Sequence, residues 1–195
     1  MTEFEYAAIF YGILVALAIE AVAANLHRLL AARRRVKWHW MAPATAVNAS
    51  LVTLLEFWTL WLRRNESSGS YTFLLFLPFA ISLVFMYLSA AATLPDDVPA
   101  DGLNLREFYF DNRAHYWGLV AGLFVFNVLL NVIDQFRFGW FGPTWQTDLP
   151  QLVGDVVAIG VAAPLIFVRN YWWHAIGICT GMLYLLVFVS TMSLG

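Results

Sequence analysis

The chain has 195 residues, of which 61% are hydrophobic and only 12% are charged. Soluble domains carry about 25% charged residues, so this composition excludes an ordinary water-soluble surface and favours an integral membrane protein. The net charge of −2 gives no basis for binding nucleic acid, whose partners are strongly basic.

Six long apolar stretches follow one another along the chain. A bilayer core about 30 Å thick is crossed by a helix of about 20 apolar residues, and the stretches have that length. We expect spanning helices at about 6–28, 39–62, 71–94, 114–136, 149–168 and 171–193. These ranges occupy most of the chain, so residues 1–195 are expected to form one all-α membrane domain.

The basic residues between the stretches predict how the helices are oriented. Short loops rich in Lys and Arg stay in the cytoplasm, and the gap after the first stretch contains Arg33, Arg34, Arg35 and Lys37. Six spans then place both termini on the non-cytoplasmic side of what we expect to be a bacterial inner membrane. Binding of this basic gap to anionic lipid is a secondary interpretation.

The longest gap runs from Pro95 to Arg113. Asn104 is followed three residues later by Glu107, a spacing typical of a capping box at a helix N-terminus. We expect a short interfacial helix at about 104–113 on the cytoplasmic surface. It either anchors the chain or binds a partner.

Polar side chains recur inside four of the expected spans, in each case along one side of the helix. An ionisable group at mid-helix costs about 2.5–3.5 kcal/mol in a bilayer, so we expect these residues to face the bundle interior. The candidates are Glu20 and His27 in the first span, Asn48 and Glu56 in the second, Asn127, Asn131 and Asp134 in the fourth, and Asp155 in the fifth.

The acidic candidates lead to the first functional hypothesis. At about 1.5 Å per residue, Glu56, Asp134 and Asp155 fall in the non-cytoplasmic half of the bilayer, and Glu20 lies near its middle. No Lys or Arg lies deep in a span to bind an anion. We therefore expect a small transporter or channel for protons or cations, with Glu20 and Glu56 as its principal residues. The Asn residues can instead act as interhelical hydrogen-bonding groups.

Small residues predict where helices approach closely. Gly118 and Gly122 in the fourth span, and Gly177 and Gly181 in the sixth, follow the small-xxx-small pattern of close helix packing. We expect the fourth span to be central. The sequence leaves open whether the sixth span packs within the chain, in a homo-oligomer or on another membrane protein. Aligning the first and fourth spans gives a weak 3+3 inverted repeat, an arrangement found in transporters.

Two alternatives to transport stay open. The four histidines fall at the expected cytoplasmic ends of helices, and a pair of them can bind haem b in a b-type cytochrome; His27, His115 and His174 are weak metal-ligand candidates. The interfacial belt of aromatic residues is the other interpretation of these positions. A non-transporting accessory or scaffold protein is the third hypothesis, with a partner at residues 95–113 or on the glycine faces. Motifs for nucleophilic catalysis or nucleotide binding are absent, so an enzyme is not expected.

Overall fold

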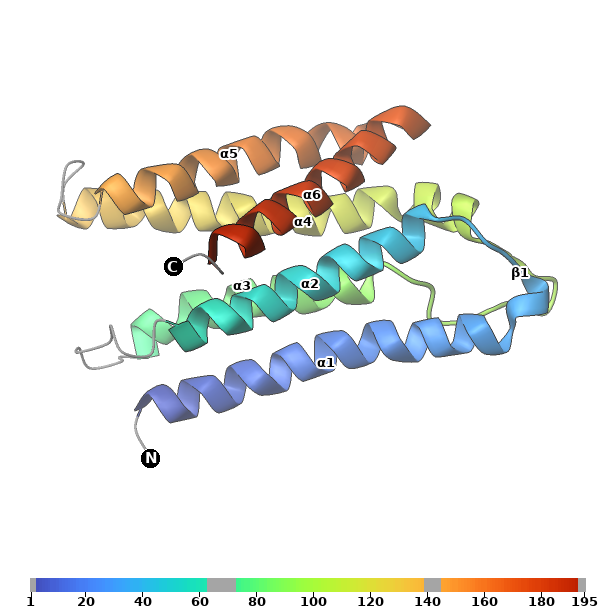
Figure 1. Ribbon diagram of the computed structural model, residues 1–195, viewed down its shortest axis with the longest axis horizontal. Helices are drawn as coiled ribbons and strands as arrows, with labels where there is room; N and C mark the ends of the chain where they lie inside the picture. The colour runs from blue at the N-terminus through green and yellow to red at the C-terminus, as the bar shows by residue number, and fades with distance from the viewer. Residues whose placement is uncertain (1–2, 63–72, 139–144, 193–195) are drawn as a thin grey trace.

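The computed structural model describes residues 3–62, 73–138 and 145–192, and these form a bundle of α-helices (Figure 1). The prediction of an all-α fold with six long helices is confirmed for this part of the chain. The helices are α1 (Glu3–Ala31), α2 (Met41–Leu62), α3 (Phe73–Ala91), α4 (Leu105–Phe138), α5 (Trp145–Phe167) and α6 (Tyr171–Met192).

The helices lie side by side, with both chain termini at one end of the bundle (Figure 1). At the opposite end, α1 is followed by the short 3₁₀ helix η1 (Arg33–Arg35) and strand β1 (Val36–Lys37). Strand β1 pairs in parallel with β2 (Leu103–Asn104), which precedes α4. We call this end, formed by residues 25–46, 89–117 and 161–178, the anchored end, and the other the terminal end.

The largest cluster of buried apolar side chains lies at the anchored end. It joins Leu29 of α1, Met41 of α2, Trp117 of α4, Leu165 of α5 and Ile178 of α6. These side chains are all at least nine-tenths buried. The two halves of the chain therefore share one core at this end.

Helices α2 and α4 occupy the middle of the bundle. Helix α2 packs against α1, α3, α4 and α6, and α4 packs against α2, α3 and α5. The central position expected for the fourth span is thus shared by two helices. Helices α1 and α3 pack closely, whereas the described parts of α4 and α6 do not pack to a comparable extent. The packing of the two halves therefore does not follow a 3+3 repeat.

Helix α4 begins where a separate interfacial helix was expected at 104–113. The Oδ1 atom of Asn104 accepts a hydrogen bond from the backbone N–H of Arg106 at 3.1 Å, which caps the helix. The helix then continues to Phe138, since no proline follows and each of its two interior glycines, Gly118 and Gly122, costs only about 1 kcal/mol. The expected interfacial helix is therefore the first part of α4.

Two helical stretches in the described residues, Ala8–Ala31 and Leu105–Ile133, are long and apolar enough to cross a membrane, judged by length and composition. Phe76–Ala91 and Leu152–Phe167 are shorter apolar helices. The prediction that all six helices span a bilayer is therefore not established by helix length and stays a prediction.

Gly102 permits the close approach of the two strands at the anchored end. Its φ of +100° lies in the left-handed region, and a Cβ at this position would be 2.8 Å from the carbonyl oxygen of Arg35. A side chain here has to push away the backbone of the Arg33–Arg35 turn, so only glycine fits without strain.

We expect Gly102→Ala to lower the free energy of unfolding by about 1–3 kcal/mol, because alanine is strained at this φ and collides with backbone. Urea unfolding of the purified chain, followed by circular dichroism, measures the change. Gly118→Ala is the matched control, since no atom lies within 4 Å of its added Cβ and alanine favours the helix. Equal stability of the two variants would contradict this role of Gly102.

Candidate functional site

His174, in the first turn of α6, is the most deeply buried ionisable side chain of the anchored end, with 0% exposure. Its Nε2 atom lies 2.8 Å from the carbonyl oxygen of Val168, and its Nδ1 atom lies 2.8 Å from the hydroxyl of Tyr109 on α4. A carbonyl can only accept, so the geometry assigns the ring proton to Nε2. The Tyr109 hydroxyl then donates to Nδ1.

Trp117 of α4 completes this arrangement by donating its Nε1–H to the Tyr109 oxygen at 3.0 Å. The rings of Tyr109 and Phe110 meet the His174 ring edge to face, with centroids 5.3 and 5.2 Å apart. We call Tyr109, Trp117, Val168 and His174 the His174 network. Each polar ring or hydroxyl group in it has a partner, which is the condition for burying such groups at low cost.

The His174 network is matched to a neutral imidazole. A proton on Nδ1 would remove the acceptor that the Tyr109 hydroxyl uses. The network joins α4 to α6 and to the end of α5, three segments far apart in the sequence. Its geometry therefore serves to hold helices together, and a proton on His174 would weaken it.

The other histidines give no paired ligand set. His27 and His115 are exposed, and His39 is half-buried, with its ring near those of Trp40 and Tyr171. His174 uses both ring nitrogens in hydrogen bonds, so binding haem b through it would require breaking one of them. In the described part of the chain, no group of three or more His, Cys, Asp or Glu side chains is placed to hold a metal ion.

Asn25 forms a second polar connection at the anchored end. Its Nδ2 atom donates to the carbonyl oxygen of Leu94 at 3.3 Å and to Oδ1 of Asp96 at 2.8 Å. Its Oδ1 accepts from Arg28 at 2.6 Å. The end of α1 is thus tied to the loop between α3 and β2. In the sequence, Asn25 stands out only as a position of the weak repeat.

Asp155 of α5 is the acidic side chain that the described bundle encloses. It is 7% exposed, and its Oδ2 atom has no hydrogen-bond partner there. It shares one side of α5 with the buried Ala162 and Leu165, while Val156 and Val157 are exposed. Burying a carboxylate is costly unless it is paired or hydrogen-bonded, so Asp155 is suited to take up a proton or a cation.

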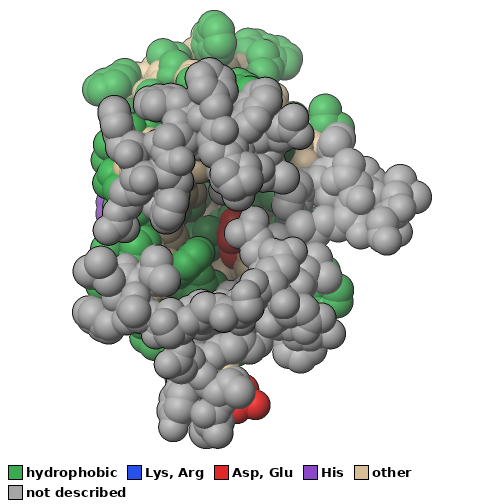
Figure 2. All heavy atoms as spheres, turned by 90° about the vertical axis from the view of Figure 1, so that its left-hand side faces the viewer, with side chains coloured by type: hydrophobic (Ala, Val, Ile, Leu, Met, Phe, Trp, Pro, Cys, Tyr) green, Lys and Arg blue, Asp and Glu red, His purple; other side chains and the backbone are tan. Residues whose placement is uncertain are grey.

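Four helices surround this region as a ring. Helices α4 and α6 each pack against α2 and α5, where contacts are strongest between α4 and α5. The diagonal pairs, α2 with α5 and α4 with α6, do not pack to a comparable extent in the described residues. In the view from the terminal end, hydrophobic side chains and an acidic side chain of the described residues are visible (Figure 2).

The other predicted acids do not gather around Asp155. Glu20 and His27 are exposed on α1. Glu20 follows the buried Ala18 by two residues, and His27 follows the buried Asn25 by two. Each exposed residue therefore lies on the opposite side of the helix from the buried one. Helix α1 packs against α2 and α3, and its remaining side faces outward. The prediction that Glu20 and His27 face the bundle interior is therefore wrong.

Two further acids complete the predicted set. Glu56 is exposed on α2 and makes an interaction of its own. Asp134 belongs to α4, but its side chain lies outside the described part of the structure. Among the described side chains, the expected convergence of acids from four helices is thus reduced to one buried carboxylate, Asp155.

The predicted asparagines differ in their surroundings. Oδ1 of Asn127 accepts a hydrogen bond from the Ser82 hydroxyl of α3 at 3.4 Å, and Asn131 donates to the backbone oxygen of Asn127 at 3.0 Å. Asn48 of α2 lies against α6, where its Nδ2 atom would be 2.9 Å from a Cβ on Gly181. The buried Oδ1 atom of Asn48 has no hydrogen-bond partner in the described structure.

The glycines of α6 face helices of the same chain. A Cβ on Gly177 would lie 2.6 Å from Cδ1 of Leu165 on α5, and Gly181 faces α2. On α4, a Cβ on Gly122 would be 3.0 Å from the Phe85 ring of α3, whereas Gly118 has no such neighbour within 4 Å. The side of α6 that carries Gly177 and Gly181 is therefore occupied within the chain.

No protein-family model, curated protein or solved structure matches the chain. The chemistry of the residues must therefore carry the functional argument. Sequence reasoning missed the His174 network, because His174 was interpreted either as a haem ligand or as part of the interfacial belt. The sequence signal that could have indicated the network is the spacing of Tyr109 and Trp117. They lie eight residues apart, which places them on nearby sides of one helix.

We expect Tyr109→Phe to destabilise the folded chain by about 1–3 kcal/mol, because it leaves the Trp117 N–H and the His174 Nδ1 buried without partners. Urea unfolding measures this loss. Tyr171→Phe is the matched control: its hydroxyl also accepts from a tryptophan, Trp40, at 2.9 Å, but at the exposed surface. The free energy of unfolding of that variant should fall by no more than about 0.5 kcal/mol. The same small loss in both would show that the His174 network does not stabilise the fold.

Proposed function

We propose that the chain is an integral membrane protein in which all six helices cross the bilayer. The outer surface supports this, because large apolar side chains are exposed on every helix. Soluble monomers rarely expose contiguous apolar patches larger than a few hundred Å², whereas acyl chains suit such a surface. The clearest examples on the six helices are Ile13 (55%), Leu54 (48%), Phe79 (49%), Leu129 (53%), Val157 (59%) and Leu183 (62%).

The arrangement of the chain ends supports the same proposal. Both termini lie at one end of the bundle, and the Arg33–Arg35 turn lies at the other (Figure 1). An even number of spans produces this arrangement, and the arginines mark the cytoplasmic side. The anchored end would then face the cytoplasm, and the terminal end would face the opposite compartment.

Within this bundle, the proposed function is a small transporter or channel that takes up a proton or a small cation at Asp155. One observation carries the proposal: Asp155 Oδ2 and Asn48 Oδ1 are buried oxygen atoms without hydrogen-bond partners in the described structure. They come from α5 and α2, which lie on opposite sides of the four-helix ring.

Helix α6 contacts both helices that carry these oxygens. Asn48 lies against Gly181, and a Cβ on Gly154, next to Asp155, would be 3.7 Å from the Tyr184 hydroxyl. Gly181 and Tyr184 are three residues apart, which is about 4.5 Å along a helix. Helices α2 and α5 therefore both contact the second half of α6 close to the residues that carry these oxygens.

The chemistry of this pair favours a cation over an anion. Carboxylate and amide oxygens are the donors that hard cations prefer, and a carboxylate also binds a proton. The sequence has no Lys or Arg from His39 to Leu62, from Phe138 to Val168, or in α6. Helices α2, α5 and α6 therefore supply no positive side chain to neutralise Asp155.

The two ends of the ring suit different roles. The anchored end is filled by the His174 network and the apolar core around it. An ion would reach Asp155 from the terminal end. Release on the other side would require the His174 network to open, as in alternating access.

We expect Asp155→Asn to abolish proton or cation flux in proteoliposomes, because the amide has nearly the shape of the carboxylate but cannot hold the charge of a cation or carry the proton. Flux is measured with an internal pH dye, and with Na⁺ or K⁺ gradients in parallel. Glu20→Gln, which neutralises an exposed acid on α1, is the matched control and should retain flux. Absence of flux in the parent chain, or full flux in Asp155→Asn, would overturn the proposal.

A further inference from the structure

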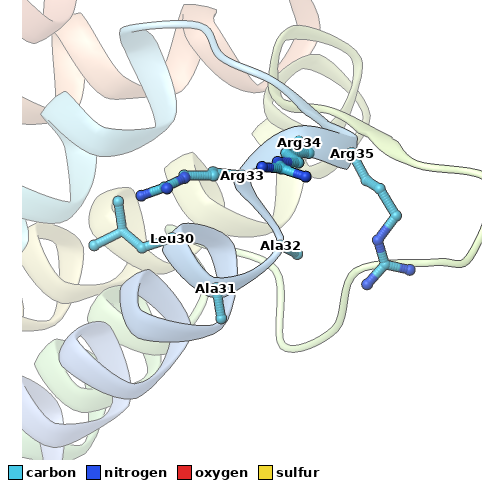
Figure 3. A pocket seen from close by; sticks show the side chains of 6 residues that line it. All are labelled: Leu30, Ala31, Ala32, Arg33, Arg34 and Arg35. Carbon is cyan, nitrogen blue, oxygen red and sulfur yellow. The ribbon is translucent and has the colours of Figure 1, made fainter.

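We propose that the pocket at the Arg33–Arg35 turn binds the phosphate group of an anionic phospholipid, with an acyl chain lying along α1. This inference rests on the proposed membrane location of the chain and is independent of transport. The pocket is an open hollow of about 550 Å³ on the surface of the anchored end (Figure 3). It is lined by Leu30, Ala31, Ala32, Arg33, Arg34 and Arg35.

The guanidinium groups of this pocket are available for a ligand. Arg33, Arg34 and Arg35 are exposed, and their side chains make no hydrogen bond or ion pair in the described part of the chain. Elsewhere, Arg28 is bonded to Asn25 and Arg169 to Asp111. Guanidinium groups bind phosphate oxygens with paired, charge-assisted hydrogen bonds. The unused donors of the turn therefore match a phosphate group.

Apolar side chains continue from the pocket along α1. Leu30 is 51% exposed and lines the pocket, and Leu26, one helical turn earlier, is 36% exposed. Figure 3 shows Arg33 extending on the same side as Leu30, while Arg35 points away from both. A ligand that joins a phosphate to a hydrocarbon chain would contact Arg33 and Leu30 together.

The geometry of the turn favours a lipid over a free phosphate ion. Successive side chains of a 3₁₀ helix are rotated by about 120°, so the three arginines spread apart and do not converge on one small ion. Free phosphate would gain few contacts, whereas a lipid adds the surface of Leu30 and Leu26. The exposed Trp38 and Trp40 lie close by in the chain, and tryptophan is typical of headgroup depth.

The test is a binding titration of the full-length chain in detergent, read by native mass spectrometry. The ligands are phosphatidylglycerol, phosphatidylcholine and inorganic phosphate. Each arginine near an anionic headgroup contributes about a fivefold gain in affinity. Arg33→Gln combined with Arg34→Gln should therefore weaken phosphatidylglycerol binding by about 25-fold. Phosphatidylcholine and inorganic phosphate should bind far more weakly to the parent chain.

The matched control removes two positive charges at the same end, outside the pocket, by Lys37→Gln combined with Arg106→Gln. This variant should weaken phosphatidylglycerol binding much less than the pocket variant does if the pocket is the site. Equal weakening of phosphatidylglycerol binding in the two double variants would show that the lipid responds only to the overall surface charge. That result would overturn the proposal. Inorganic phosphate that binds as tightly as phosphatidylglycerol would overturn it in favour of a phosphate ion site.

Failure of this proposal is distinguishable from failure of the transport proposal. Asp155→Asn should bind phosphatidylglycerol like the parent chain, because Asp155 lies on α5, away from the Arg33–Arg35 turn. Leu30→Ser should weaken phosphatidylglycerol binding, because it removes apolar contact with the acyl chain. If Leu30→Ser binds this lipid like the parent chain, an acyl chain does not lie along α1 and the proposal is wrong.

Discussion

Burying His174 constrains the anchored end, because each polar group around the ring has to find a partner. Tyr109 and Trp117 meet this demand from one side of α4, which fixes the rotation of α4 about its axis. The bond from His174 to Val168 likewise fixes the start of α6 against the end of α5. With α6 held in this orientation, Gly177 faces α5 and Gly181 faces α2. The position of α6 between these two helices thus depends on one satisfied polar network.

The proposed ion site follows from this arrangement. Glycines on α6 allow close approach to both α2, which carries Asn48, and α5, which carries Asp155. The helices are fixed most firmly at the anchored end, where the β1–β2 pair and the contacts of Asn25 also tie the connections together. The proposed path therefore begins at the terminal end and is closed at the anchored end. This division suits a carrier that opens one side at a time.

The sequence predicted the number and the approximate limits of the helices because long apolar runs and a basic gap are strong local signals. It also indicated the cap at Asn104. It did not predict which side of each helix packs inward. In a membrane bundle both the packed and the lipid-facing sides are apolar, so periodicity does not distinguish the sides of α1 that carry Ala18 and Glu20. Partners 65 residues apart, such as Tyr109 and His174, leave no signal in local spacing.

The central claim is that the exposed apolar surface of this bundle lies against lipid, and Cys179 provides a direct probe of it. It is the only cysteine of the chain, it is exposed on α6, and it lies about 12 Å along the helix from Tyr171. A nitroxide on Cys179 in liposomes should collide readily with oxygen, which concentrates in acyl chains, and rarely with a water-soluble nickel chelate. Frequent collision with the nickel chelate and rare collision with oxygen would contradict the account.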